Sequence, residues 1–156
     1  KFDALTLLHV LEHLEKPAEL LLELTRSNLN EKALIVIEVP NFNSWQSKIA
    51  GRKWMHLDVK HHVSHFTSEQ LEKLEIQGNF QLIRTHYFSI HLGVLGMAAA
   101  VLNKFGYSGN IIEDLKERKK KILVSIGLIL PLAFILEAIA VFLKGGGVCR
   151  KYFQKN

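Results

Sequence analysis

Residues 33–39 read Ala-Leu-Ile-Val-Ile-Glu-Val, and this stretch decides the fold. The run Ala33–Val39 is β-branched and nearly all apolar, which is typical of a strand covered on both faces of a sheet. A second short apolar run, Phe2–Leu8, also predicts a buried strand. Between the two runs, Pro17 suits the first turn of a helix, and leucines follow it at helical spacing. The order strand, helix, strand predicts a βαβ unit with parallel strands.

The rest of the chain predicts further helices and strands around this unit. The predicted helices are Asn43–Ala50, a helix capped by Thr67 that ends near Gly78-Asn79, Ile90–Phe105, and Ile111–Leu143 as one long helix or a pair kinked near Pro131. The predicted strands are Phe80–Phe88 and Val148–Phe153, the second after a flexible break at Gly145-Gly146-Gly147.

Composition and charge exclude several classes of protein. The chain has 156 residues, 48% of them apolar and 22% charged, which is the composition of a globular domain. Its one cysteine, Cys149, rules out an internal disulfide framework and fits a reducing compartment. Residues 1–115 hold 11 Lys/Arg against 13 Asp/Glu, a net charge of −2, whereas residues 116–156 hold 9 against 2, a net charge of +7. Because the basic charge is confined to one segment, we expect no nucleic-acid partner.

The chain opens on Lys1-Phe2-Asp3, directly at the first predicted strand. A domain rarely begins on a buried strand without a preceding turn, so we expect this chain to be an N-terminally truncated fragment. A natural edge strand at the terminus is the alternative.

Five motifs in a fixed order carry a resemblance to a known family. They are Phe2-Asp3 with His9-Val10-Leu11-Glu12-His13-Leu14, Val39-Pro40-Asn41, Trp54 with Leu57-Asp58, His62 and His65-Phe66-Thr67, Gly93-Val94-Leu95-Gly96 with Leu102-Asn103-Lys104, and the closing glycine-rich turn and strand. Over residues 2–152, the sequence resembles the second half of class I S-adenosylmethionine-dependent methyltransferases. The subgroup that it resembles is related to ubiquinone-type O-methyltransferases.

The resemblance implies an α/β fold, namely the C-terminal half of a Rossmann-like methyltransferase sheet (strands four to seven) with a hydrophobic helical insertion between the last two strands. Residues 1–89 and 145–156 would form the partial core, and residues 90–144 an apolar insertion that serves as a lid or docks on a membrane. The implied cofactor is S-adenosylmethionine, with its main contacts upstream of Lys1, so we expect the fragment alone to be inactive. The implied acceptor is a small molecule or a lipid, methylated at oxygen.

Polar residues follow the first predicted strand. Ligands of open α/β sheets bind beyond the carboxyl ends of the strands, so Leu8, His9 and Val10 are predicted cofactor contacts. One helical turn would bring His9, Glu12 and His13 to one face, where they can bind a divalent metal. The alternative is a hydrogen-bond network that only holds the turn.

The predicted loop Gly51–Phe66 contains four of the eight histidines. His62 and His65 are predicted catalytic residues, because an imidazole accepts a proton from an acceptor hydroxyl near neutral pH. Asp58 is predicted to orient one of these imidazoles. The alternative is a surface loop with solvated histidines, packed by its aromatic residues.

Two further residues are predicted to bind substrate. Trp54 offers an apolar or stacking wall for the acceptor. Asn41, directly after the second strand, is a polar contact to cofactor or acceptor, or else caps the turn that follows Pro40.

The longest apolar run, Ile122–Leu143, has 18 Ala, Val, Ile, Leu or Phe among its 22 residues and is long enough to cross a bilayer. Lys116, Arg118 and Lys119–Lys121 precede it. Glu137 within the run, and the return of the last strand to the sheet, argue against a span. We therefore expect a kinked, interfacial or re-entrant helical hairpin at an anionic membrane surface, on the cytoplasmic side. A soluble lid over the active site is the alternative.

Three functions follow from these features. The leading hypothesis is S-adenosylmethionine-dependent methyl transfer. The others are a membrane-docking module without catalysis, and a soluble metal-binding module built on the histidines.

Overall fold

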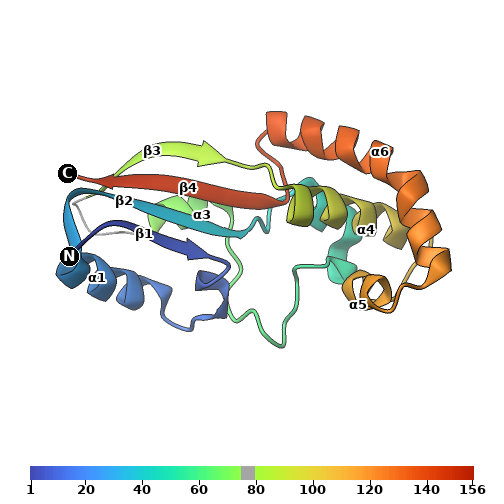
Figure 1. Ribbon diagram of the computed structural model, residues 1–156, viewed down its shortest axis with the longest axis horizontal. Coiled ribbons are helices and arrows are strands. Elements are labelled where there is room, and N and C mark those ends of the chain that lie inside the picture. Colours follow the sequence, from blue (N-terminus) through green and yellow to red (C-terminus); the bar gives the residue numbers. More distant parts are fainter. Residues whose placement is uncertain (75–79) are drawn as a thin grey trace. The chain divides into compact units, whose positions relative to one another are not determined.

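The computed structural model describes residues 1–74 and 80–156 (Figure 1). The chain forms two compact units. The sheet unit comprises Lys1–Pro40, Val59–His86 and Cys149–Asn156, and the helical unit comprises Asn41–Asp58 and Tyr87–Val148. The helical unit thus holds residues 41–58 in addition to the whole of the predicted insertion, residues 90–144. The predicted helix end at Gly78-Asn79 lies outside the described residues.

The sheet unit is built on a mixed four-stranded sheet. Its strand order is β1 (Phe2–Leu8), β2 (Leu29–Pro40), β4 (Val148–Lys155) and β3 (Phe80–His86) (Figure 1). The strands β1 and β2 pair in parallel, and β3 and β4 pair antiparallel. The α/β class and the parallel βαβ unit are therefore confirmed.

Two helices belong to this sheet. The helix α1 (Pro17–Asn28) carries Pro17 in its first turn, where the missing N–H leaves no helical bond unmade, and it packs along β2. The helix α3 (Ser68–Lys73) begins with the predicted capping box between Thr67 and Gln70. The buried core of the unit includes Leu7, Leu21, Ile35, Ile37, Leu71 and Phe153.

An ion pair between a buried lysine and a half-exposed glutamate joins β4 to α3. Lys151 is 1% exposed, and its Nζ donates to Glu72 Oε2 at 2.8 Å and to Thr85 Oγ1 at 3.4 Å. A buried ammonium is stable only when its donors find acceptors, so this contact fixes the position of α3 on the sheet.

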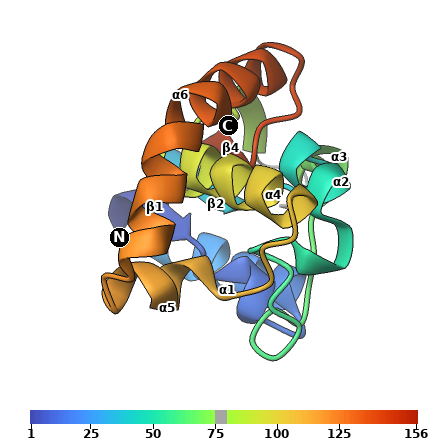
Figure 2. The ribbon, with the colours of Figure 1, turned by 90° about the vertical axis from the view of Figure 1, so that its right-hand side faces the viewer.

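The helical unit contains α2 (Trp45–Ala50), a 3-10 turn at Gly51–Lys53, a π-helical turn at Ile90–Val94, α4 (Leu95–Lys104), α5 (Ile111–Lys116) and α6 (Lys120–Phe142). Figure 2 shows α6 running along α4, with α5 at the N-terminal end of α6. Ala98, Ala133 and Ala140 are small enough to allow this close packing, and Val94 and Met97 complete the same core cluster.

The break between the last two helices differs from the prediction. The chain leaves its helix at residues 117–119, where Arg118 has a positive φ of 52°, and α6 then runs through Pro131. A proline inside a helix removes one hydrogen bond. The helix continues because Ile126 and Ala133, on either side of Pro131, are both buried against the unit.

The triple-glycine segment also differs from the prediction. Gly145, Gly146 and Gly147 are buried rather than a flexible break. A Cβ at Gly145 would lie 2.8 Å from Trp45 Cδ1, so only glycine permits this approach of the turn to α2.

Among the described residues, one helix is long and apolar enough to cross a membrane. This helix is α6, with a mean hydropathy of 2.5. Only 17% of its apolar window is buried in the protein.

Candidate functional site

The carboxyl end of β1 is organised around His9. Its φ is 55°, a left-handed conformation that is uncommon for a residue with a side chain. Its Nδ1 lies 3.0 Å from Glu12 Oε1 and its Nε2 lies 3.1 Å from Glu38 Oε1. Burial lowers the pKa of His9, but the hydrogen bonds and charges of the two carboxylates outweigh it and raise that pKa to about 9. At neutral pH, His9 is therefore an imidazolium ion that donates from both nitrogens.

A second cation completes this network. Arg150 on β4 donates from Nε to Glu38 Oε2 at 2.6 Å. Burial favours the neutral form of Glu38, yet the His9 hydrogen bond and the Arg150 charge hold its pKa below the ordinary value. The strand ends of β1, β2 and β4 are thereby tied together by alternating charges.

Hydrogen bonds tie the loop that contains His62 to the turn that follows β1. Ser64 N–H donates to Glu12 O at 3.0 Å, and Ser64 Oγ donates to Leu14 O at 3.1 Å. His13 Nδ1 donates to His61 O at 2.9 Å. Two predicted clusters that lie fifty residues apart in the sequence therefore form one cluster in the sheet unit.

Glu12, His13 and His62 form the centre of this cluster. One ligand atom from each lies within 4.8 Å of the others. The rings of His13 and His62 meet edge to face, with centroids 4.7 Å apart. Because His13 donates from Nδ1, its lone pair is on Nε2, which is the arrangement of a metal-binding imidazole. Glu12 is 2% exposed, and its Oε2 has no hydrogen-bond partner.

The predicted metal set differs from this grouping in one member. His9 was expected to join Glu12 and His13, but both of its nitrogens are engaged by carboxylates and its pKa is raised. An imidazolium has no lone pair for a metal. The contacts of His9 are those that the turn-holding network requires.

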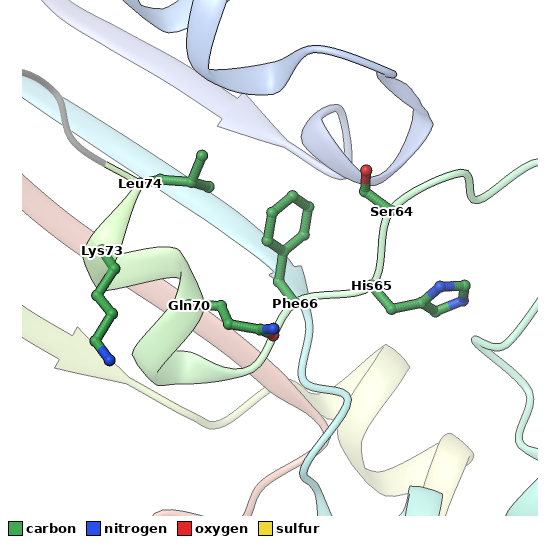
Figure 3. A pocket seen from close by; sticks show the side chains of 6 residues that line it. All are labelled: Ser64, His65, Phe66, Gln70, Lys73 and Leu74. Carbon is green, nitrogen blue, oxygen red and sulfur yellow. The ribbon is translucent and has the colours of Figure 1, made fainter.

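A hollow of about 380 Å³ lies next to this cluster. Figure 3 shows its lining, with the Phe66 ring standing between Ser64 and Leu74. The predicted catalytic residue His65 is part of this lining, together with Gln70 and Lys73. Its volume lies in the range of small-molecule sites, and its lining mixes apolar and hydrogen-bonding groups.

The predicted substrate residues Trp54 and Asn41 lie in the helical unit, and both are buried. Trp54 is 4% exposed, and its Nε1 donates to Gln46 Oε1 at 3.2 Å. Asn41 is 1% exposed, and its Nδ2 donates to Gly146 O at 3.0 Å. The roles of both residues in binding an acceptor stay predictions.

The predicted pairing of Asp58 with a catalytic histidine also stays a prediction. Asp58 belongs to the helical unit, whereas His62 and His65 belong to the sheet unit.

Sequence reasoning missed three residues that organise the two units. Glu38 carried a usable signal, since it is the one charged residue in the run 33–39. Arg150 carried no such signal, because its partner Glu38 lies on a strand that is distant in the sequence. Gln46 is fully buried and donates from Nε2 to Gly93 O at 3.3 Å. A Cβ at Gly96 would collide with its side chain, so that glycine makes room for an amide.

Comparisons with known proteins agree with this fold. Residues 1–85 match the methyltransferase domain family, and because this is more than half of its length, the chain belongs to that family. A search of curated proteins gave no match.

Two solved structures show the same fold. One is a SAM-dependent methyltransferase from Archaeoglobus fulgidus, with a TM-score of 0.52 and 23% identity over 98% of this chain and 59% of that one. The other is the (4+2)-cyclase SpnF, with a TM-score of 0.51 and 13% identity over 99% of this chain and 50% of that one. The chain thus spans between half and three fifths of the length of these two structures.

Proposed function

We propose that the protein transfers a methyl group from S-adenosylmethionine to an oxygen of a small-molecule or lipid acceptor, on the pattern of the ubiquinone-type O-methyltransferases. The observation that carries the proposal is the position of the charged cluster. It follows β1, one of two parallel strands inside the segment that matches the methyltransferase family. Ligands of such sheets bind beyond the carboxyl ends of the strands.

The cofactor supplies an electrophilic methyl group on a sulfonium. In the transfer, the acceptor oxygen forms a bond to the methyl carbon as the sulfur–carbon bond breaks, and the hydroxyl proton must leave. We assign this proton to His62, with His65 in the adjacent hollow placing the acceptor. The protein otherwise contributes orientation.

Leu8, His9 and Val10 are assigned to the cofactor side. Leu8 is 50% exposed although it ends a strand whose preceding residue, Leu7, is buried. An exposed apolar side chain at a strand end fits a flat apolar ligand group. His9 is assigned there through the turn that it holds, because both of its ring nitrogens are bound to Glu12 and Glu38.

Methyl transfer is the direct test. Protein expressed from the complete gene is incubated with methyl-labelled S-adenosylmethionine and with fractionated lipids and small molecules. We expect a labelled product whose label resists mild base if it is an ether. His62→Gln should lower turnover about 10²-fold, with cofactor affinity unchanged. The matched control is His91→Gln, an exposed histidine of the helical unit.

Two outcomes would contradict the proposal. If calorimetry detects no binding of S-adenosylmethionine, the protein is a non-catalytic module. If the His62→Gln variant keeps the turnover of the parent protein, the proton goes to another group.

As an alternative to a proton-accepting His62, we propose a divalent metal site at Glu12, His13 and His62. Two imidazoles and one carboxylate are ligands typical of Zn²⁺, and the unpartnered Glu12 Oε2 is the observation that favours it. A metal there would polarise a bound acceptor oxygen.

Titration with Co²⁺ tests the metal site in the absence of any acceptor. Visible absorption bands of a four-coordinate ion are expected at one equivalent, and His13→Gln should remove them while His91→Gln should not. Elemental analysis showing no bound metal, together with no Co²⁺ spectrum, would leave the turn-holding network as the role of these residues.

A further inference from the structure

The helix α6 leaves most of its circumference uncovered. Its buried residues follow one stripe, which consists of Ile122, Ile126, Ala133, Glu137 and Ala140. The remaining surface is apolar, with Leu128 78% exposed and Phe142 85% exposed. A long helix that is apolar all round and covered on one side only needs an apolar environment for the rest of its surface.

Glu137 fixes which side of the helix faces the protein. It is fully buried, its Oε1 accepts the Gly147 N–H at 2.8 Å, and a Cβ at Gly93 would lie 2.6 Å from that oxygen. The one acid in the apolar part of α6 is therefore enclosed by the helical unit. The face that remains outside carries no acid between Leu123 and Leu143.

Both ends of α6 are attached to the same unit. Near the N-terminal end, Ile122 and Ile126 pack with Leu102 and Ile111. Near the C-terminal end, Ala140 belongs to the cluster around Met97, and its carbonyl accepts the Gly145 N–H at 2.7 Å. Because both ends of α6 are held by its own unit, the surface that is left for a partner is the side of the helix and not its ends.

The exposed charges at the two ends of this surface are predominantly positive, with Glu113 and Glu117 as acids near the N-terminal end. Lys116, Arg118, Lys120 and Lys121 are exposed at the N-terminal end of α6, and Lys144 is exposed at its other end. Lys119 differs from its neighbours because it forms ion pairs with Asp114 and Glu117. Asp114 in turn accepts the Tyr107 hydroxyl at 2.6 Å. Lys119 therefore holds the corner between α5 and α6, and its neighbours point their charges to solvent.

We propose that the uncovered face of α6 docks in the plane of an anionic lipid bilayer, with Leu128 and Phe142 in the acyl region and Lys120 and Lys121 at the headgroups. The charge complementarity between exposed lysines and anionic lipids selects a bilayer over a second copy of the chain. The cytoplasmic leaflet carries the anionic lipids that such lysines recognise. This inference does not depend on methyl transfer.

Vesicle flotation of the full chain is the first test. The vesicles are phosphatidylcholine alone, or phosphatidylcholine mixed with phosphatidylglycerol. We expect binding to both, tighter to the mixture. Lys120→Gln with Lys121→Gln should weaken binding to the mixture about 10-fold and leave binding to phosphatidylcholine unchanged. Leu128→Ser with Phe142→Ser should weaken both. Val59→Ser, which changes a residue of the sheet unit that is 73% exposed, is the matched control and should change neither.

Spin labels measure the orientation of the helix. Cysteines replace Val124, Leu128, Ile135 and Phe142 one at a time, and the native Cys149 does not react because it is fully buried. An in-plane helix places all four labels at a similar depth, about 5–10 Å below the headgroups. A spanning helix places the middle labels deepest and the outer two near opposite surfaces.

Three results would overturn the proposal. The first is that the protein stays in the soluble fraction with both kinds of vesicle, as expected for a soluble lid. The second is that the Leu128→Ser and Phe142→Ser changes convert a dimer to a monomer without any vesicle binding, which would assign the face to a second copy of the chain. The third is that the depths of the spin labels follow the pattern of a spanning helix.

Discussion

His9 shows at the residue scale how a local conformation and a charge network depend on each other. The left-handed backbone of His9 turns the chain so that its ring lies between Glu12 and Glu38. Two buried carboxylates would repel each other without a cation between them. The imidazolium therefore stabilises the turn, and Arg150 balances the second charge of the pair.

This network predicts a pH-dependent stability. The folded-state pKa of His9 is raised from the ordinary 6.5 to about 9, so the stabilisation is fully present below about pH 6.5 and is lost as the pH rises through about 9. His9→Gln should remove this dependence and destabilise the protein at pH 7 by about 2 kcal/mol. Chemical denaturation at several pH values measures both effects.

NMR titration gives an independent check on the same residue. The His9 ring protons should titrate near pH 9, and His91→Gln should leave the pH dependence of stability unchanged. A His9 resonance that titrates near its ordinary value would show that the carboxylates do not hold it charged.

Sequence reasoning reached the chemistry of these residues but not their partners. The motif His9–His13 indicated a polar turn at a strand end, because strand and turn patterns are local. The pairing of Glu38 with Arg150 depends on strand order, which brings residues 112 positions apart together. Likewise, nothing in the local sequence places His62 against His13.

At the scale of elements, the ion pair between Lys151 and Glu72 predicts an asymmetry between its two partners. Glu72→Gln leaves a buried ammonium without its counter-charge and should cost about 3 kcal/mol of unfolding free energy. Lys151→Met keeps the apolar stem and removes the charge, so it should change stability by no more than about 1 kcal/mol.

The exposed pair of Lys16 and Glu19 is the control for that measurement. Both side chains are 70% exposed, so Glu19→Gln should have an effect below about 0.5 kcal/mol. If Glu72→Gln and Lys151→Met lower the free energy of unfolding equally, the pair acts through the attraction of its charges alone. The burial of an unpaired Lys151 ammonium would then carry no penalty.

Glu137 gives a second prediction at this scale. Burial raises the pKa of Glu137, and the Gly147 N–H lowers that pKa only in part. Stability should then fall as the pH rises above the ordinary range of a carboxyl group. Glu137→Gln should remove this fall, while Glu137→Leu should lose the bond to Gly147 and cost about 1–3 kcal/mol at every pH.

Thermal melts of the three proteins across the neutral range provide the measurement. If the parent protein and Glu137→Gln show the same pH dependence, the carboxyl group does not change its protonation state in the folded protein over that range.

Elements with local signals were predicted well, and those set by packing were not. The capping box at Thr67 and Pro17 in the first turn of α1 depend on near neighbours, and both are present. Pro131 also gave a local signal, but the packing of α6 on α4 overrides it. The break falls instead at Arg118, where Asp114 and Lys119 close the corner. The glycines 145–147 read as a loose linker because their tight neighbours, such as Trp45, are remote in sequence.

At the scale of the whole molecule, the charge is divided along the chain. Residues 1–115 carry a net charge of −2 and residues 116–156 a net charge of +7. An anionic surface therefore attracts residues 116–156 more strongly than the rest of the chain. The basic part is also the part that contains the uncovered face of α6.

This division predicts a two-part response of vesicle binding to salt. Salt screens the attraction between lysines and anionic lipids over a distance of about 10 Å at 0.1 M, but it does not weaken apolar burial. For phosphatidylglycerol-containing vesicles, the association constant should fall as salt rises and then level off at the value measured with phosphatidylcholine. The Lys120→Gln and Lys121→Gln protein should begin closer to that level and fall less, because fewer charges remain to be screened. Binding that vanishes at high salt would mean that only the lysines touch the membrane, and binding that salt leaves unchanged would mean that they do not touch it. Either result contradicts a face on which exposed lysines and an apolar helix act together.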